Sequence, residues 1–128
     1  MALILLDTHA WVWWLNRDRK LKASAKRSIA EADSIGISPV TLYEVANAVR
    51  RERLELSLPI ERWLTFALAT GVIVLPVEPS IAALAGSMDW LHGDPCDRII
   101  VATAMHHDVP LVTADKQISK SGLVEVVW

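Results

Sequence analysis

The chain has 128 residues, a formal net charge of −2 and a hydrophobic fraction of 52%. This length predicts one domain, residues 1–128, with a single sizeable core. The near-neutral charge excludes a global field that would draw the protein onto nucleic acid, so any such binding must be local.

The hydrophobic fraction, the cysteine count and the placement of charges narrow the class further. The hydrophobic fraction is high for a soluble monomer, and we interpret it as a sign of a buried subunit interface. Cys96 is the only cysteine, which excludes an internal disulfide and a cysteine-based zinc site and is typical of a reducing cytoplasm. The longest uncharged stretch, 63–77, is too short to span a membrane. The opening run 1–6 ends in Asp7 without a basic leader, so we expect no secretory signal.

The first predicted elements place an acid between a strand and a helix. Residues 2–6 form a continuous apolar run, typical of a strand buried on both faces of a parallel sheet. Residues 8–15 favour a short amphipathic helix. Asp7 therefore lies at the carboxyl end of the strand, and it is also a good N-cap for the helix. Residues 16–22 are polar and basic, as in a loop.

The next elements carry a second acid. A helix is predicted over 24–32 and a short strand over 34–38, although Gly36 weakens the strand pattern. Ser38 and Pro39 then start a helix with an apolar stripe, and Glu44 lies opposite this stripe, facing water or a cleft. Alternatively, Glu44 is the second half of a capping box with Thr41. The basic residues Arg50, Arg51 and Arg53 end this helix; they complement the helix dipole on a solvated face or contact nucleic acid.

The second half of the chain continues the alternation. Helices are predicted over 59–70 and 79–91, with a strand at 72–75 between them. Gly93, Asp94 and Pro95 break the chain and open a helix that ends near 107–108. A strand follows at 110–113, then Asp115, a short helix, and an edge strand at 124–127. Strands that alternate with helices predict an α/β fold with a mostly parallel central sheet covered on both faces.

Acids recur where such a fold places its functional crevice, beyond the carboxyl ends of the strands. Asp7 and Asp115 follow strands, and Asp97 lies in the first turn of a helix that commonly emerges on the same side. Carboxylates gathered there repel one another, so we expect them to share a divalent cation, Mg²⁺ or Mn²⁺ rather than zinc. Two such ions about 4 Å apart can activate water for attack on a phosphodiester. The alternative is that each acid only caps its own helix, and spacing alone does not decide between them.

Four short stretches of the chain carry a resemblance to a known family. They are LLDTH at 5–9, SPVTLYEV at 38–45, HGDPCDR at 92–98 followed by Ala102 and Ala104, and LVTAD at 111–115. In this order they closely resemble PIN-domain proteins, and most of all the VapC-type toxins of bacterial and archaeal toxin–antitoxin pairs. The resemblance covers essentially the whole chain. Each stretch alone is weakly specific, whereas four in the family's order are strongly so.

This resemblance implies a three-layer α/β/α PIN-like domain that acts as a metal-dependent endoribonuclease, leaving a 5′-phosphate and a 3′-hydroxyl. Asp7 and Asp97 match the family's central metal ligands, and Glu44 and Asp115 would complete the cluster directly or through waters. Thr113 matches a hydroxyl that supports the site, and Thr8 is a further candidate for that role. The implied cofactor is Mg²⁺ or Mn²⁺. The implied partners are an RNA substrate, a small cognate antitoxin that places a basic side chain among the acids, and a second copy in a homodimer.

Other residues of the motifs have more ordinary interpretations. Asp94 is interpreted as the cap of the helix that carries Asp97 rather than as a ligand. Cys96 departs from the aromatic residue often found there, which we expect to alter packing beneath the site. His9 can touch a phosphate or act structurally, whereas three histidines are assigned structural roles because no ligand partner can be named for them: His92, His106 and His107.

The tryptophans and the basic residues remain to be placed. The tryptophans of apolar helices are predicted to lie in the core or an interface rather than to stack on bases: Trp11, Trp13, Trp14, Trp63 and Trp90. The densest basic stretch would form a rim for RNA phosphates: Arg17, Arg19, Lys20, Lys22, Lys26 and Arg27.

Two alternative functions remain open. A non-catalytic PIN-like module would bind RNA or protein without cleavage. A phosphatase would use Asp7 as a nucleophile. The usual haloacid-dehalogenase arrangement has a second Asp two residues after the nucleophile, but this chain has His9 at that position.

Overall fold

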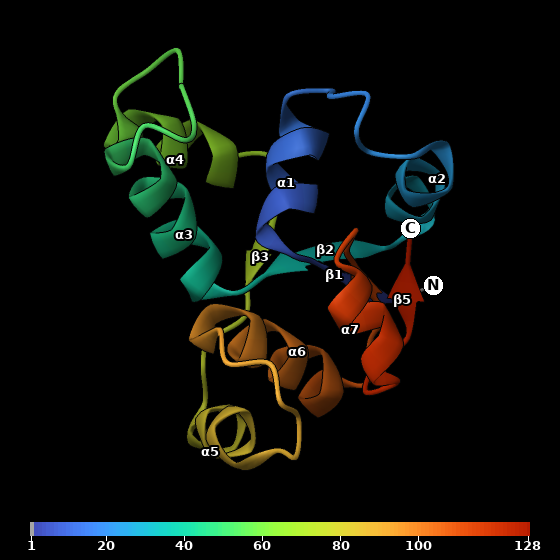
Figure 1. Cartoon of the computed structure of the whole chain (residues 1–128). Coiled ribbons are helices and arrows are strands. Elements are labelled where there is room, and N and C mark those ends of the chain that lie inside the picture. Colours follow the sequence, from blue (N-terminus) through green and yellow to red (C-terminus); the bar gives the residue numbers. More distant parts are fainter. Residues whose placement is uncertain (1) are drawn as a thin grey trace.

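The computed structural model describes residues 2–128, and a five-stranded parallel sheet runs through its centre (Figure 1). The strands are ordered β3-β2-β1-β4-β5, and every pairing between neighbours is parallel. Their bounds are β1 Leu3–Leu6, β2 Ser34–Ile37, β3 Ile73–Val74, β4 Leu111–Val112 and β5 Val126–Val127. The described residues also form seven helices: α1 Thr8–Leu15, α2 Ala23–Glu31, α3 Pro39–Arg50, α4 Ile60–Leu68, α5 Pro79–Ser87, α6 Pro95–His107 and α7 Lys116–Ser121.

Alternating side chains of β1 build the two cores that make the protein three-layered. Ile4 and Leu6 pack on one face of the sheet with Trp11 of α1 and with apolar residues of α2, α3 and α4. Leu5 points to the other face and packs with Ile100 of α6 and with α7. In Figure 1, α1 and α2 lie on one side of the strands and α5 and α6 on the other. The predicted α/β/α architecture with a parallel sheet is confirmed.

Glycine in β2 has a packing reason. Gly36 is buried, and a Cβ atom at this position would lie 3.0 Å from a methyl group of Leu75 and 3.3 Å from one of Leu3. The absence of a side chain therefore lets the segment after β3 close onto the sheet. The residue that weakens the strand pattern in the sequence is the one that the packing requires.

One of the three tryptophans of α1 lies in the core, as predicted. Trp11 is fully buried and packs edge-on against Trp63 of α4, with ring centroids 5.5 Å apart. No helix among residues 2–128 combines the length and the apolar character needed to cross a bilayer.

One predicted helix is wrong at its end. The pattern predicted a helix over 79–91, but α5 ends at Ser87, and Met88 has an extended backbone with ψ of 144°. The reason is tertiary. The guanidinium of Arg98 in α6 donates hydrogen bonds to the carbonyls of Met88, Trp90 and His92, and these bonds hold the segment outside a helix. The other predicted ends agree within about two residues, as is usual for helix and strand boundaries.

Candidate functional site

Two neighbouring strands bring the first pair of acids together. β1 and β4 pair directly, with Leu6 opposite Val112, and the backbone N–H of Asp7 donates to the carbonyl of Val112 at 3.1 Å. Asp7 and the segment 113–115 therefore leave the sheet side by side at its carboxyl edge. This edge is where α/β proteins commonly bind their ligands.

Asp7 is both a helix cap and a member of this site. Its Oδ1 accepts the backbone N–H of Ala10 at 2.8 Å, which caps α1. Its carboxylate also accepts the hydroxyl of Thr113, and the same hydroxyl oxygen accepts the backbone N–H of Asp115 at 3.0 Å. Thr113 is fully buried, so one threonine positions both the carboxylate of Asp7 and the backbone of Asp115. Capping and membership of the site, which were alternatives in the sequence, are compatible.

Asp97 enters the site from the first turn of α6. Asp94 caps this helix, as predicted, by accepting the backbone N–H of Cys96 at 2.9 Å and that of Asp97 at 3.4 Å. The side chain of Asp97 has a partner that sequence reasoning missed, because Nε2 of His92 lies 2.7 Å from its Oδ2. His92 was assigned a structural role without a ligand partner. The signal that could have found it is its place five residues before Asp97, across the turn formed by Gly93 and Asp94.

Glu44 reaches the site from the middle of α3. Its Oε1 accepts the hydroxyl of Thr8 at 2.5 Å, and that hydroxyl lies 3.2 Å from the hydroxyl of the fully buried Thr41. Ser38, rather than Thr41, caps α3 by accepting the N–H of Val40. The capping-box interpretation of Glu44 is therefore wrong, because its carboxylate is turned across to α1.

The four predicted acids line one cavity of about 360 Å³. Asp115 joins it from the start of α7, which it caps by accepting the N–H of Gln117 at 2.8 Å. Ligand atoms of His92, Asp97 and Asp115 all lie within 4.8 Å of one another. The full lining is Asp7, Thr8, His9, Trp13, Glu44, Asp94, Asp97, Ala114 and Asp115. Trp13, predicted for the core or an interface, is half-buried and forms part of this wall.

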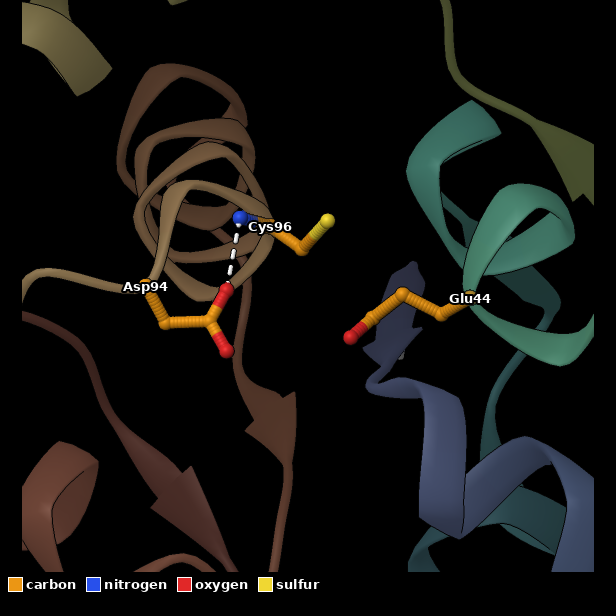
Figure 2. A group of neighbouring side chains, drawn as sticks. All are labelled: Glu44, Asp94 and Cys96. Carbon is orange, nitrogen blue, oxygen red and sulfur yellow. Dashed lines mark hydrogen bonds between the residues drawn. The ribbon is translucent and has the colours of Figure 1, made fainter. Parts of the chain in front are cut away.

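Figure 2 shows how the two sides of the cavity face each other. Glu44 extends from α3 toward the start of α6, where Asp94 and Cys96 lie, and ligand atoms of the three residues are within 4.8 Å of one another. The thiol of Cys96 thus points into the gap between the two helices. Its sulfur lies beside the acids, and the change in packing expected from Cys96 stays a prediction.

The electrostatics of the cavity disfavour so many negative charges. Burial raises the pKa of Asp7 to about 6, and the nearby Asp97 adds to the increase against the opposing hydrogen bonds of Thr113 and Ala10. Burial also raises the pKa of Asp97 and of Glu44, each with contributions from neighbouring acids. Burial, together with Glu44, Asp94 and Asp97, likewise raises the pKa of the Cys96 thiol to about 11. Burial and the neighbouring carboxyl groups therefore both disfavour ionisation of these side chains.

This donor set suits a hard divalent cation. Carboxylate oxygens dominate the cavity, and each of three acids already has a side-chain hydrogen-bond partner: Asp7 has Thr113, Glu44 has Thr8, and Asp97 has His92. A cation would compensate both the burial and the mutual repulsion that raise the pKa values of these acids. Oxygen-rich sites of this kind favour Mg²⁺, Mn²⁺ or Ca²⁺ over softer metals.

The fold and the site together define a class: an α/β protein with a parallel sheet whose carboxyl edge gathers one buried and three half-buried acids suited to a divalent cation. The sequence model of the PIN domain matches residues 4–122, and the chain belongs to this family. It is 35% identical over 119 residues to Ribonuclease VapC22 of Mycobacterium tuberculosis (strain ATCC 25618 / H37Rv), a match that covers 92% of this chain and 91% of the relative.

Solved structures share the fold at lower identity. The chain is similar to VapBC2 from Rickettsia felis bound to a DNA fragment from its promoter, with a TM-score of 0.70 and 15% identity over 97% of this chain and 96% of the other. It is also similar to VapC20 of Mycobacterium tuberculosis, described as a sarcin-ricin loop cleaving toxin. That likeness has a TM-score of 0.67 and 22% identity over 98% of this chain and 99% of the other.

Proposed function

We propose that this chain is a metal-dependent endoribonuclease and the toxin of a toxin–antitoxin pair. The observation that carries the proposal is the convergence of Asp7, Glu44, Asp97 and Asp115 on one cavity at the carboxyl edge of the sheet. The name of the Mycobacterium tuberculosis relative, a ribonuclease that matches 92% of the chain, supports the reaction class. Residues 1–128 would act as a single PIN domain.

The four acids would act as metal ligands in this reaction, and a buried threonine would position one of them. Asp7 and Asp97 would be the main ligands of Mg²⁺ or Mn²⁺, with Glu44 and Asp115 completing the set. When bound, such an ion supplies Lewis-acid chemistry, lowering the pKa of water and neutralising the charge of the scissile phosphate. Thr113 would hold the carboxylate of Asp7 in place. Because these contacts exist before any substrate arrives, the acids would not need to reorganise during the reaction.

An RNA cleavage assay tests the enzyme. A structured RNA incubated with the purified protein and Mn²⁺ or Mg²⁺ should yield defined fragments with 5′-phosphate ends, and EDTA should stop the reaction. The Asp97→Asn variant is the matched control for contaminating nucleases, because it retains the size and hydrogen-bonding shape of the side chain. Cleavage that persists in EDTA or in this variant would contradict the proposal. Binding of RNA without any cleavage would favour the non-catalytic module instead.

The toxin role can be examined in growing cells. Expression of this chain alone should slow bacterial growth, because cleavage of cellular RNA blocks translation, and co-expression of the small adjacent reading frame should relieve the defect. The Asp97→Asn variant, expressed to the same level, should be harmless. Normal growth with folded, active wild-type protein would count against a toxin role.

A homodimer remains part of the proposal, on different grounds from those in the sequence. In the tryptophan-rich helix α1, Trp11 is fully buried and packs within the chain, so this side chain does not contribute to an interface. Large exposed apolar side chains lie instead on α3 and α4, where Tyr43 is 62% and Phe66 60% exposed. These two neighbouring helices are the surface that we propose for a second copy.

A further inference from the structure

A second hollow opens from the acidic cavity and lies between α1 and α3. It has a volume of about 510 Å³ and shares four lining residues with the acidic cavity, which makes the two continuous: Thr8, His9, Trp13 and Glu44. Its far end is lined by the segments that follow the two helices, at 16–20 and 51–54. We call this hollow the basic groove, for the charges described next.

The far end of the basic groove carries cations without a carboxylate partner, and the Nζ of one of them, Lys20, lies 5.9 Å from the centre of the Trp13 ring. Lys20, Arg51 and Arg53 line it, and among residues 2–128 none of these three side chains lies within 4.0 Å of a carboxylate. Asp18 is an acid on the same wall, and its Oδ1 accepts the backbone N–H of Lys20 at 2.9 Å. The groove therefore changes from acidic at Glu44 to basic at its other end.

The helices α1 and α3 end at the groove in the same way, with a left-handed residue. After α1, Arg17 adopts a left-handed conformation with φ of 53°, and the N–H of Asp18 returns to the carbonyl of Trp13 at 2.9 Å. After α3, Glu52 has φ of 59°, and the N–H of Arg53 returns to the carbonyl of Ala48 at 2.9 Å. Both are Schellman motifs without glycine. The same motif ends α6, where Asp108 has φ of 52° and the N–H of Val109 donates to the carbonyl of Ala104 at 3.1 Å, so the motif marks helix ends rather than the groove itself.

An amide group adds to this wall. Asn47 lines the groove from α3, and its Oδ1 accepts a hydrogen bond from the guanidinium of Arg50 at 2.6 Å. This bond uses the oxygen of Asn47, so the group that Asn47 can offer to a ligand is its NH₂ donor. Cations and an amide donor together suit an anionic oxygen ligand.

We propose that the basic groove holds the phosphodiester backbone of a single RNA strand that leads into the acidic cavity. The inference rests on the proposed ribonuclease function, because the acids must face a phosphate at the other end of the same groove. The groove has a volume of about 510 Å³, which has room for the backbone of one strand but not for a duplex. Lys20, Arg51 and Arg53 would bind phosphates on one side of the scissile bond.

The expected occupant is RNA rather than an acidic protein segment for a reason of charge. An acidic segment that continued from the basic end would bring its own carboxylates to Glu44 and Asp97, which line the cavity at the other end of the groove. An RNA strand reaches the acids as a phosphate diester, which carries one charge and shares a divalent cation with them. The basic arginines at the end of α3, which the sequence left undecided between solvent and nucleic acid, are thus assigned in part to RNA.

The basic residues of the stretch 17–27, predicted to form one rim for RNA, do not lie along a single hollow. Of its six basic residues, Lys20 lines the basic groove, whereas Arg17 and Lys26 line a separate hollow with Trp14 and Leu21. Arg27 lies exposed on α2 and lines none of these hollows. This division supplies a matched control for the experiment.

The test measures binding of a fluorescein-labelled, 12-nucleotide single-stranded RNA by anisotropy in EDTA at several salt concentrations. EDTA stops metal-dependent cleavage and leaves the acids equally repulsive in every variant. Arg51→Gln, Arg53→Gln and Lys20→Gln should each raise Kd roughly 3- to 10-fold at 0.1 M salt. Each should also lower the slope of log Kd against log salt by about 0.7, the loss of one phosphate contact. Arg27→Gln should change neither quantity.

The outcomes separate this inference from the function on which it rests. Groove-dependent binding by a protein that never cleaves RNA with Mn²⁺ would support the groove and contradict the ribonuclease. Cleavage by a protein whose RNA affinity and salt slope are the same in all four variants would support the ribonuclease and overturn the groove. Unchanged RNA binding together with lost binding of the co-expressed antitoxin would assign the groove to the protein partner, which also overturns the inference.

Discussion

The Asp7→Asn variant is expected to lose RNA cleavage by on the order of 10²-fold or more while its metal-free form becomes more stable than the wild type. Asparagine keeps an oxygen for the N–H of Ala10, so the cap of α1 survives. It removes a buried charge whose pKa is raised from 3.8 to about 6. That shift corresponds to roughly 3 kcal/mol at neutral pH, which is an upper value for the gain in stability.

The pH dependence of this gain has a definite sign. Asp7 binds its proton more tightly in the folded protein than in the unfolded chain, since its folded pKa is the higher one. The stability contributed by this protonation is complete below pH 3.8 and is lost as the pH rises through about 6. The melting curves of the metal-free wild type and Asp7→Asn should therefore nearly coincide at pH 4 and separate by pH 7.5.

Divalent cation should reverse the order of the two proteins. A ligand that binds only the folded state stabilises it, so millimolar Mn²⁺ should raise the melting temperature of the wild type and have much less effect on Asp7→Asn. Asp89→Asn is the control, because Asp89 is exposed and does not line the cavity. If Mn²⁺ shifted all three proteins equally, Asp7 would be a helix cap alone and the proposed metal site would be wrong.

The Arg98→Met variant is expected to have the largest effect on stability. The guanidinium of Arg98 donates to four backbone carbonyls at 2.5 to 3.0 Å, those of Ala85, Met88, Trp90 and His92. Methionine keeps most of the length and loses every donor, which should cost about 2–4 kcal/mol and lower the melting temperature by about 10 °C. The melting temperature of Arg98→Lys should fall between those of the wild type and Arg98→Met, because an ammonium group cannot reach four acceptors at once as the guanidinium does.

Arg98→Met should also lower the affinity of the acidic cavity for metal, because the segment that Arg98 holds carries His92. Release of that segment would remove the partner of Asp97 Oδ2, and losing such a supporting contact typically lowers metal affinity 10- to 100-fold. His92→Phe separates the two effects. It keeps the backbone carbonyl that Arg98 binds but removes the ring donor, so Mn²⁺ affinity should fall with little change in melting temperature.

Two measurements would contradict this account of Arg98. The control for stability is Arg62→Met, since Arg62 is exposed on α4. Equal melting temperatures for Arg98→Met and Arg62→Met would show that the four carbonyl bonds contribute nothing net. Unchanged Mn²⁺ affinity in His92→Phe would show that His92 has no role in positioning Asp97.

Local rules in the sequence were sufficient for the elements that build the site. The apolar run before Asp7 and the proline after Asp94 mark a buried strand and a helix start, and both are found within about one residue of the expected position. Such signals are local, because a cap or a β-branched run depends on neighbouring residues alone. The family resemblance of the four stretches supplied the choice of acids, which spacing could not.

The sheet order and the side-chain contacts were decided only by tertiary structure. Convergence of Asp7 and Asp115 requires β1 and β4 to be neighbours, although more than 100 residues separate them. The early end of α5 and the role of His92 depend on Arg98, which bonds to carbonyls 6 to 13 residues away. Lys20 and the arginines after α3 meet only because α1 and α3 pack side by side. A local sequence pattern holds no information on such pairings, because the free energy that stabilises them arises from contacts between segments that are far apart in the sequence.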